Sequence, residues 1–194
     1  MENELELTVK LFGDLNEILN HLKHKGFNII EEFKMADIYM TREMDIYNKS
    51  PYELIGNSLL LRNIADNLLL IYKDKQYDEN GNILHQCKHE CGVESIDKAK
   101  KVLESVGYKE LVIVRQDGVV MSNGRLEFVV FNVADLGIYL EIEKLRYHEG
   151  LTDEEIIKDL VDNLNNLGLK MGTNYYEKKA FDALEKSREK TKKI

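Results

Sequence analysis

Late in the chain the sequence reads GIYLEIE over residues 137–143, and near its start it reads ELELTVKL over residues 4–11. In both stretches apolar and polar side chains alternate, which is typical of a strand with one buried face and one polar face. Glu141 and Glu143 therefore share a face of the later strand, and Glu4 and Glu6 share a face of the first. These two acidic strand faces are the basis for the expected fold and for the expected site.

The chain has 194 residues, enough for one sizeable core, and we expect residues 1–194 to form a single domain. It contains no apolar run near the roughly 20 residues of a membrane helix, and its N-terminus is acidic, so we expect no membrane association and a cytoplasmic location. The two cysteines, Cys87 and Cys91, lie too close together in the sequence to staple a fold. The sequence leaves a homodimer open.

The formal net charge of −8 argues against a nucleic-acid partner or an anionic membrane surface, because both require a broad basic field. It does not exclude a small polyanion. A triphosphate can lie among a few buried cations, particularly where a divalent metal ion neutralises part of its charge.

Periodicity and turn residues predict strands alternating irregularly with helices. The expected strands cover residues 4–11, 27–40, 58–64, 68–75, 83–91, 111–115, 125–133 and 138–145. The expected helices cover residues 14–25, 95–107 and a segment from Thr152 to Gly168, and a last helix starts at about Tyr175. Strict strand and helix alternation is absent, which favours an α+β class with an antiparallel sheet or barrel.

If both acidic faces point into one cavity, four carboxylates converge there, and cations must join them. Oxygen ligands of this kind select magnesium or manganese. Basic side chains suited to phosphate lie on the expected strands: Arg62, Lys73, Lys75, Lys88 and Arg115. The alternative is an edge strand whose polar face simply meets water.

A second set of metal-ligand types lies at alternate positions: His85, Cys87, His89 and Cys91. In a strand the outermost two are about 20 Å apart, so one zinc ion cannot take all four. We expect Lys88 and Glu90 to face the interior and the cysteines and histidines to lie on the other face.

Several short motifs, in order and spacing, resemble the CYTH family, which includes class IV adenylyl cyclases, thiamine triphosphatases and inorganic triphosphatases. The resemblance spans nearly the whole chain, and its most telling part is residues 136–143. The other motifs are Glu4-Leu5-Glu6, Asp37-Ile38-Tyr39, Leu61-Arg62, Tyr72-Lys73 and Val106-Gly107-Tyr108 before the strand with Arg115.

The resemblance implies a closed or nearly closed eight-stranded tunnel with helices packed outside. By position it implies Mg²⁺ or Mn²⁺ ligands at Glu4, Glu6, Glu141 and Glu143, and triphosphate ligands at Arg62, Lys73, Lys88 and Arg115, with Lys10 as a further candidate. The implied chemistry is displacement at phosphorus, by water in a triphosphatase or by a ribose hydroxyl in an adenylyl cyclase. Hydrolysis of a nucleotide, thiamine or inorganic triphosphate is the preferred hypothesis, and no catalytic base is assigned.

Four positions that are usually charged in the family carry other residues here: Thr8, Ile64, Ile113 and Phe131. Thr8 stands where a lysine is usual, and Lys10 lies about 7 Å further along the strand. Each lost charge weakens triphosphate binding by roughly 1.5 to 3 kcal/mol. The sequence therefore also allows a ligand that is smaller or more apolar, and a non-catalytic protein that binds organic phosphates.

Overall fold

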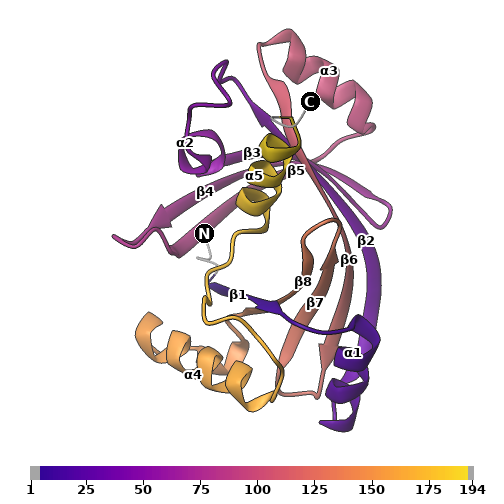
Figure 1. Cartoon of the computed structure of the whole chain (residues 1–194), viewed down its shortest axis with the longest axis vertical. Helices are drawn as coiled ribbons and strands as arrows, with labels where there is room; N and C mark the ends of the chain where they lie inside the picture. The colour runs from indigo at the N-terminus through magenta and orange to yellow at the C-terminus, as the bar shows by residue number, and fades with distance from the viewer. Residues whose placement is uncertain (1–4, 192–194) are drawn as a thin grey trace.

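The computed structural model describes residues 5–191, in which eight antiparallel strands form one curled sheet with helices outside it (Figure 1). The strands are β1 (Glu6–Leu11), β2 (Asn28–Thr41), β3 (Ser58–Ile64), β4 (Asn67–Tyr77), β5 (Ile83–Gly92), β6 (Lys109–Ser122), β7 (Glu127–Val133) and β8 (Gly137–Glu143). The helices are α1 (Leu15–His24), α2 (Pro51–Ile55), α3 (Ile96–Ser105), α4 (Asp153–Asn166) and α5 (Lys179–Thr191), with a 3₁₀ turn at Arg146–His148. No helix within residues 5–191 is both long enough and apolar enough to cross a membrane.

The strand order is β1-β8-β7-β6-β2-β3-β4-β5, and the curled sheet forms half a barrel. The expected α+β class and the tunnel-like antiparallel sheet are thereby confirmed. The β1–β8 pairing places Glu6 opposite Glu143 and Thr8 opposite Glu141. β1 and β5 are the two edge strands of the sheet. The gap between these two strands is called the seam below.

Apolar side chains pack on both faces of the sheet. The outer face of β1, β7 and β8 packs with α1 and α4 in a core that includes Leu7, Leu140 and Leu160. The inner face contributes Tyr139 and Phe131 to a second core, which α5 completes with Leu184. Because neighbouring residues of a strand point to opposite faces, β8 gives its even-numbered positions to the outer core and its odd-numbered positions to the interior.

β6 is longer than the sequence predicted. The prediction that this strand ends at residue 115 is wrong, because β6 continues through Asp117 and Gly118 and pairs them with Lys34 and Phe33 of β2. A Cβ atom on Gly118 would lie 2.4 Å from Cζ of Phe33, so glycine permits this close approach. The short helix α2, which begins with a capping box between Ser50 and Glu53, was also not predicted.

The start of the last helix also differs from the prediction. Residues 170–178, which we call the C-terminal strap, run along the outer edge of β1, and α5 begins at Lys179 rather than near Tyr175 (Figure 1). The amide of Thr8 donates to the carbonyl oxygen of Tyr175 at 3.0 Å, and the amide of Glu177 donates to the carbonyl oxygen of Thr8 at 3.0 Å. The edge of β1 needs such partners because its backbone donors and acceptors are otherwise unsatisfied.

Candidate functional site

The inner face of the sheet encloses a cavity of about 240 Å³ whose wall is rich in charge. Four acidic and four basic side chains line it: Glu6, Asp37, Glu141 and Glu143, and Arg62, Lys73, Lys88 and Lys179. Ligand pockets for drug-sized molecules usually occupy about 300–1,000 Å³, so this cavity suits a compact ligand. Its charge pattern suits a polyanion accompanied by cations.

The acids of β1 and β8 meet around the hydroxyl of Thr8. Oγ1 of Thr8 lies 3.3 Å from Oε1 of Glu6 and 3.4 Å from Oε1 of Glu141. Burial and the nearby carboxylate of Glu141 raise the pKa of Glu6 from 4.5 to about 7, against the opposing effect of Lys73. A carboxylate in this state is stabilised by any cation that comes close to it.

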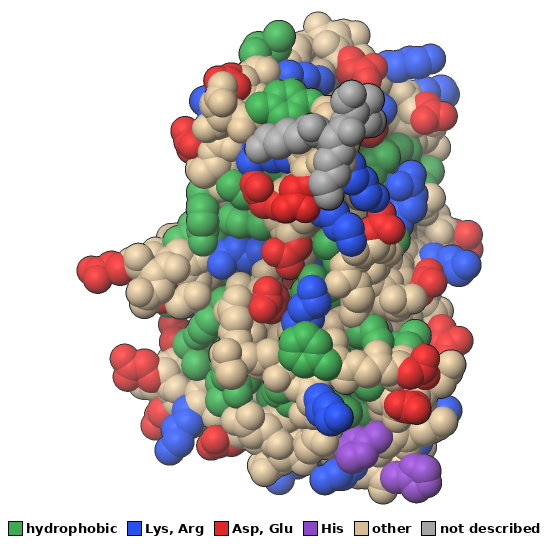
Figure 2. Space-filling model, in the orientation of Figure 1, with side chains coloured by type: hydrophobic (Ala, Val, Ile, Leu, Met, Phe, Trp, Pro, Cys, Tyr) green, Lys and Arg blue, Asp and Glu red, His purple; other side chains and the backbone are tan. Residues whose placement is uncertain are grey.

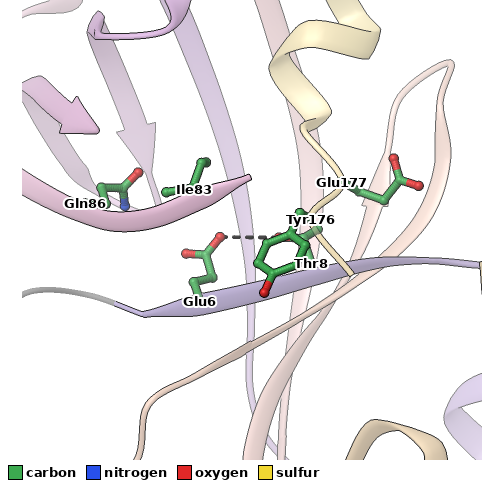
Figure 3. A pocket seen from close by; sticks show the side chains of 6 residues that line it. All are labelled: Glu6, Thr8, Ile83, Gln86, Tyr176 and Glu177. Carbon is green, nitrogen blue, oxygen red and sulfur yellow. Dashed lines mark hydrogen bonds between the residues drawn. The ribbon is translucent and has the colours of Figure 1, made fainter. Parts of the chain in front are cut away.

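Figure 3 shows Glu6 and Thr8 side by side on β1, where the seam separates them from Ile83 and Gln86 of β5. Tyr176 of the C-terminal strap lies over Thr8 and forms an isolated parallel β-bridge with it. The strap therefore narrows the seam beside the acidic end of the cavity.

Asp37 of β2 and Arg62 of β3 form a bidentate ion pair inside the cavity. Nε of Arg62 donates to Oδ1 of Asp37 and its Nη2 donates to Oδ2, each at 2.7 Å. The side chains are 3% exposed for Asp37 and 16% exposed for Arg62. Burial opposes the charged guanidinium, yet the hydrogen bonds to Asp37 hold the pKa of Arg62 above its ordinary value. The pair fixes the guanidinium in one orientation toward the cavity.

Lys179, the first residue of α5, extends into the cavity from the C-terminal part of the chain. Its Nζ lies 2.7 Å from Oε1 of Glu141 and donates to Oε1 of Gln116 at 2.9 Å. The same ammonium lies 3.6 Å from the centroid of the Phe131 ring. Lys179 therefore neutralises the carboxylate of Glu141 in this structure.

The structure brings together most of the residues that the sequence pointed to. Those that line the cavity are Glu6, Glu141, Glu143, Arg62, Lys73 and Lys88. Glu4 lies outside the described residues. The roles of these residues as metal or phosphate ligands remain predictions.

Two expected phosphate ligands do not line the cavity. Arg115 is exposed and lies in a groove with Lys34 and Asn63, because the alternation of β6 points Val114 and Gln116 inward instead. Lys10 lies on β1 beyond the cavity, with its Nζ 5.4 Å from the centroid of the Tyr139 ring. Placing Arg115 in the interior was therefore wrong.

The four positions that depart from the family pattern do not all face the cavity. Ile64 and Phe131 line it, and Thr8 bonds two of its acids. Ile113 instead borders a separate groove beside α5. The loss of charge at Ile113 therefore does not change the wall of the cavity.

Lys179, Gln86 and Gln116 line the cavity but were not singled out from the sequence. Gln116 and Gln86 carry no charge, so nothing in their residue type marked them. Lys179 was not a candidate because the sequence placed it inside a helix expected to begin four residues earlier. Asp37 and Tyr39 belonged to a motif of the resemblance but had no assigned role.

The donor set fits a divalent ion that is shared with a ligand. Within residues 5–191, no three Asp, Glu, His or Cys side chains gather closely enough to hold an ion by themselves. Magnesium commonly uses one or two carboxylates and completes its shell with water and phosphate oxygens. Glu6 and Glu141, which converge on one hydroxyl, provide carboxylate oxygens of this kind.

The cysteine and histidine positions of β5 do not form such a group either. Nε2 of His85 pairs with the carboxylate of Asp153 at 3.2 Å, and Sγ of Cys87 lies 3.7 Å from Nε2 of His89. As expected, Lys88 lies on the cavity side of this strand, although Glu90 is exposed and pairs with Lys88 at 3.5 Å.

Two titratable side chains with shifted pKa values, Glu6 and Lys75, predict an unusual dependence of stability on pH. Burial and Lys73 lower the pKa of Lys75 from 10.5 to about 7, with a smaller effect from Lys178 and an opposing one from Glu6. The raised pKa of Glu6 makes stability fall as pH rises from about 4.5 to 7, because the native state binds the extra proton. The lowered pKa of Lys75 makes stability rise from about pH 7 to 10.5, because the unfolded state binds the extra proton.

We therefore expect the metal-free protein to be least stable near pH 7 within the range from about pH 5 to 10. Each of the two pKa shifts changes the free energy of unfolding by roughly 2 to 4 kcal/mol across its pH range. Urea unfolding in EDTA at several pH values measures the free energy of unfolding. We expect Glu6→Gln to remove the fall in stability below pH 7 and Lys75→Met to remove the rise above pH 7. A stability maximum at pH 7 contradicts the expectation.

The surface around α5 carries both signs of charge. Figure 2 shows acidic and basic side chains interspersed over this face, without an extended patch of one sign. Four basic side chains also line the cavity, where four acidic side chains accompany them.

Comparison with known proteins supports the same fold. No family model matches the sequence. Over 147 residues the chain is 26% identical to a Methanocaldococcus jannaschii protein named "Putative adenylate cyclase", covering 73% of this chain and 76% of that protein. A solved structure from Pyrococcus horikoshii OT3 aligns with a TM-score of 0.68 and 20% identity, over 94% of this chain and 99% of that one.

A second solved structure is that of a Hippeastrum protein, which is described as a "putative adenylyl cyclase" with a dominant triphosphatase activity. It aligns with a TM-score of 0.63 and 12% identity, over 96% of both chains. The sequence relative and these structures fit the CYTH-like fold expected from the sequence.

Proposed function

We propose that this protein binds a triphosphate together with Mg²⁺ or Mn²⁺ in the cavity and hydrolyses it. The observation that carries the proposal is the meeting of Glu6 and Glu141 with Arg62, Lys73 and Lys88 around one enclosed space. The name of the sequence relative and the triphosphatase activity of a structural neighbour support the same class of substrate.

Charge balance supports the requirement for a metal ion. The four bases of the cavity wall are matched by its four acids, so the wall alone has little positive charge to spare for a triphosphate. A magnesium or manganese ion held by Glu6 and Glu141 would supply charge to the phosphate oxygens and polarise the phosphorus. Arg62, held in place by Asp37, would bind phosphate oxygens with the donors that the carboxylate leaves free.

In hydrolysis, the oxygen of water forms a bond to the terminal phosphorus, the bond to the bridging oxygen breaks, and the proton that the water loses passes to solvent. The leaving diphosphate retains that oxygen and its added negative charge. Lys73 and Lys88, on β4 and β5, line the cavity and would neutralise charge on the phosphate chain. The contribution of the side chains is binding, orientation and charge neutralisation.

The test combines a thermal-shift measurement with product identification. We expect tripolyphosphate, ATP or thiamine triphosphate with magnesium to raise the melting temperature by roughly 5 to 10 °C at 100 times its Kd. Sulfate and monophosphate at equal ionic strength serve as controls. Release of orthophosphate supports hydrolysis, and release of cyclic AMP with pyrophosphate supports a cyclase instead.

Stabilisation without any turnover would identify a binding protein, an outcome that the uncharged residues Thr8, Ile64 and Phe131 near the cavity also allow. No stabilisation by any triphosphate, with or without metal, would remove the proposal altogether.

A further inference from the structure

We propose that Lys75 binds a phosphate group of the ligand beside Lys73, and that this anion is the charged partner which Lys75 lacks within residues 5–191. The inference rests on the proposed function, because it concerns the same triphosphate. It adds a second lysine of β4 to the site and couples ligand binding to the uptake of a proton.

Lys75 lies next to the wall of the cavity. Side chains alternate along β4, so Lys75 shares the inner face of the strand with Lys73, and its partner on β5 is Gln86. Lys73 and Gln86 both line the cavity. Nζ of Lys75 lies 3.5 Å from Oγ of Ser58, the residue that β3 pairs with Lys73. The side chain of Lys75 therefore leans back along the strand toward Lys73, and its flexible stem can bring the ammonium group to the wall.

The two lysines of β4 differ from the other basic side chains of the site in their partners. Arg62, Lys88 and Lys179 each form an ion pair with an acid. In the described part of the chain, neither Lys73 nor Lys75 forms an ion pair. A phosphate group that binds at these two lysines therefore does not have to compete with a carboxylate for them.

The surroundings of Lys75 oppose its charge while no anion is bound. Burial, together with the ammonium groups of Lys73 on the same strand and Lys178 on the C-terminal strap, lowers the pKa of Lys75 from 10.5 to about 7. Glu6 of β1 opposes this shift and is the one acid among these groups. A phosphate group beside Lys75 would offset the burial and the repulsion, because an opposite charge favours the charged form. Ligand binding should therefore raise the pKa of Lys75, so that the complex holds a proton that the free protein lacks.

A purely structural role for Lys75 makes different predictions. In that case the amine only donates to Ser58, at a distance near the long limit of a hydrogen bond. Lys75→Met would then leave the ligand affinity unchanged, and ligand binding would take up no proton at this position.

The first experiment measures proton uptake. Tripolyphosphate is titrated into the wild type with magnesium present, by calorimetry at pH 8, in buffers that differ in ionisation enthalpy. At this pH about nine-tenths of the Lys75 side chains are neutral in the free protein, and about nine-tenths of the Glu6 carboxylates are already ionised. We expect binding to take up more than about half a proton per site, because Lys75 gains a proton and Glu6 has little left to release.

The second experiment measures the affinity for tripolyphosphate as a function of pH. Because the complex holds the extra proton, the wild-type affinity should fall by up to about tenfold between pH 8 and pH 9. Lys75→Met should lose this pH dependence. At pH 7 it should bind about tenfold more weakly than the wild type, which is the value of a weak charge-assisted hydrogen bond.

Two further variants serve as controls. Lys75→Arg stays charged throughout this pH range, so it should retain binding and take up no proton, which separates the loss of charge from a loss of folding. Lys98→Met should behave as the wild type, because Lys98 is an exposed lysine of α3. The melting temperatures of all variants are measured in parallel.

Unchanged affinity and unchanged pH dependence in a folded Lys75→Met protein would overturn this inference and leave the proposed function intact. Wild-type binding without proton uptake at pH 8 would have the same meaning, even if Lys75→Met does not fold. A wild-type protein that does not bind tripolyphosphate would overturn both proposals.

Discussion

Replacing Arg62 with alanine is expected to destabilise the protein by about 3 to 5 kcal/mol and to abolish measurable triphosphate binding. The first effect arises because Asp37, whose side chain is 3% exposed, would lose its only bidentate partner among residues 5–191. The loss of binding arises because the cavity would lose its one arginine and, with it, one positive charge. Urea unfolding and calorimetry with tripolyphosphate measure the two effects separately.

The double variant Asp37→Ala, Arg62→Ala distinguishes these causes. Removing both partners of a buried pair costs much less than removing one, so its stability should lie well above that of Arg62→Ala. Its ligand binding should remain lost. If the double variant binds tripolyphosphate as the wild type does, Arg62 has no role in the site.

Replacing Glu6 with glutamine is expected to change stability and ligand binding in opposite directions. At pH 8 without metal, the variant should be more stable by roughly 1 to 3 kcal/mol, because a neutral amide replaces a carboxylate that burial and Glu141 disfavour. With magnesium and tripolyphosphate, it should lose most of the wild-type stabilisation and at least about 100-fold in turnover, as expected for loss of a metal ligand.

Chemical unfolding in EDTA, followed by thermal shift with metal and ligand, tests the expectation for Glu6→Gln. Glu127→Gln is a suitable control, because Glu127 is an exposed glutamate of β7 that does not line the cavity. Equal metal-dependent stabilisation in Glu6→Gln and the wild type would mean that Glu6 is not a ligand. A fall in metal-free stability would mean that its carboxylate is satisfied by the protein alone.

The strand positions of the acids could be predicted because alternation is a local property. Once GIYLEIE was recognised as a strand with an apolar outer face, Glu141 and Glu143 had to share the other face. The same logic applied to Glu6, and the β1–β8 register brings the two strands together. The meeting of acids from distant parts of the sequence followed from the resemblance, because local patterns do not determine which strands pair.

Arg115 shows where alternation stops being informative. β6 carries apolar side chains on both faces, because Val112 and Val114 lie in the inner core and Val119 and Met121 lie in the outer core. When both faces are apolar, the pattern does not indicate which one lines the interior. Arg115 was assigned to the interior by its residue type and by its position in the resemblance, and the structure places Gln116 there instead.

Lys179 could not be predicted for a different reason. The helical pattern from Tyr175 onward was real, but the open edge of β1 binds the backbone of Tyr175 and Glu177 and delays the helix. Hydrogen bonding to a distant strand outweighed local helix propensity. The presence of Thr8 in place of the usual lysine is visible in the sequence. The position of Lys179 beside Thr8 is visible only in the structure.

The pairing of β1 has a consequence for synthesis of the protein. Within the described chain, β1 has β8 as its partner on one side and the C-terminal strap on the other, so its neighbours are made more than 120 residues later. Contacts of such long range form slowly and late. On the ribosome, β1 must therefore wait without these partners until the segment through about residue 178 has been translated, and a nascent chain that stalls before it would lack the acidic end of the cavity.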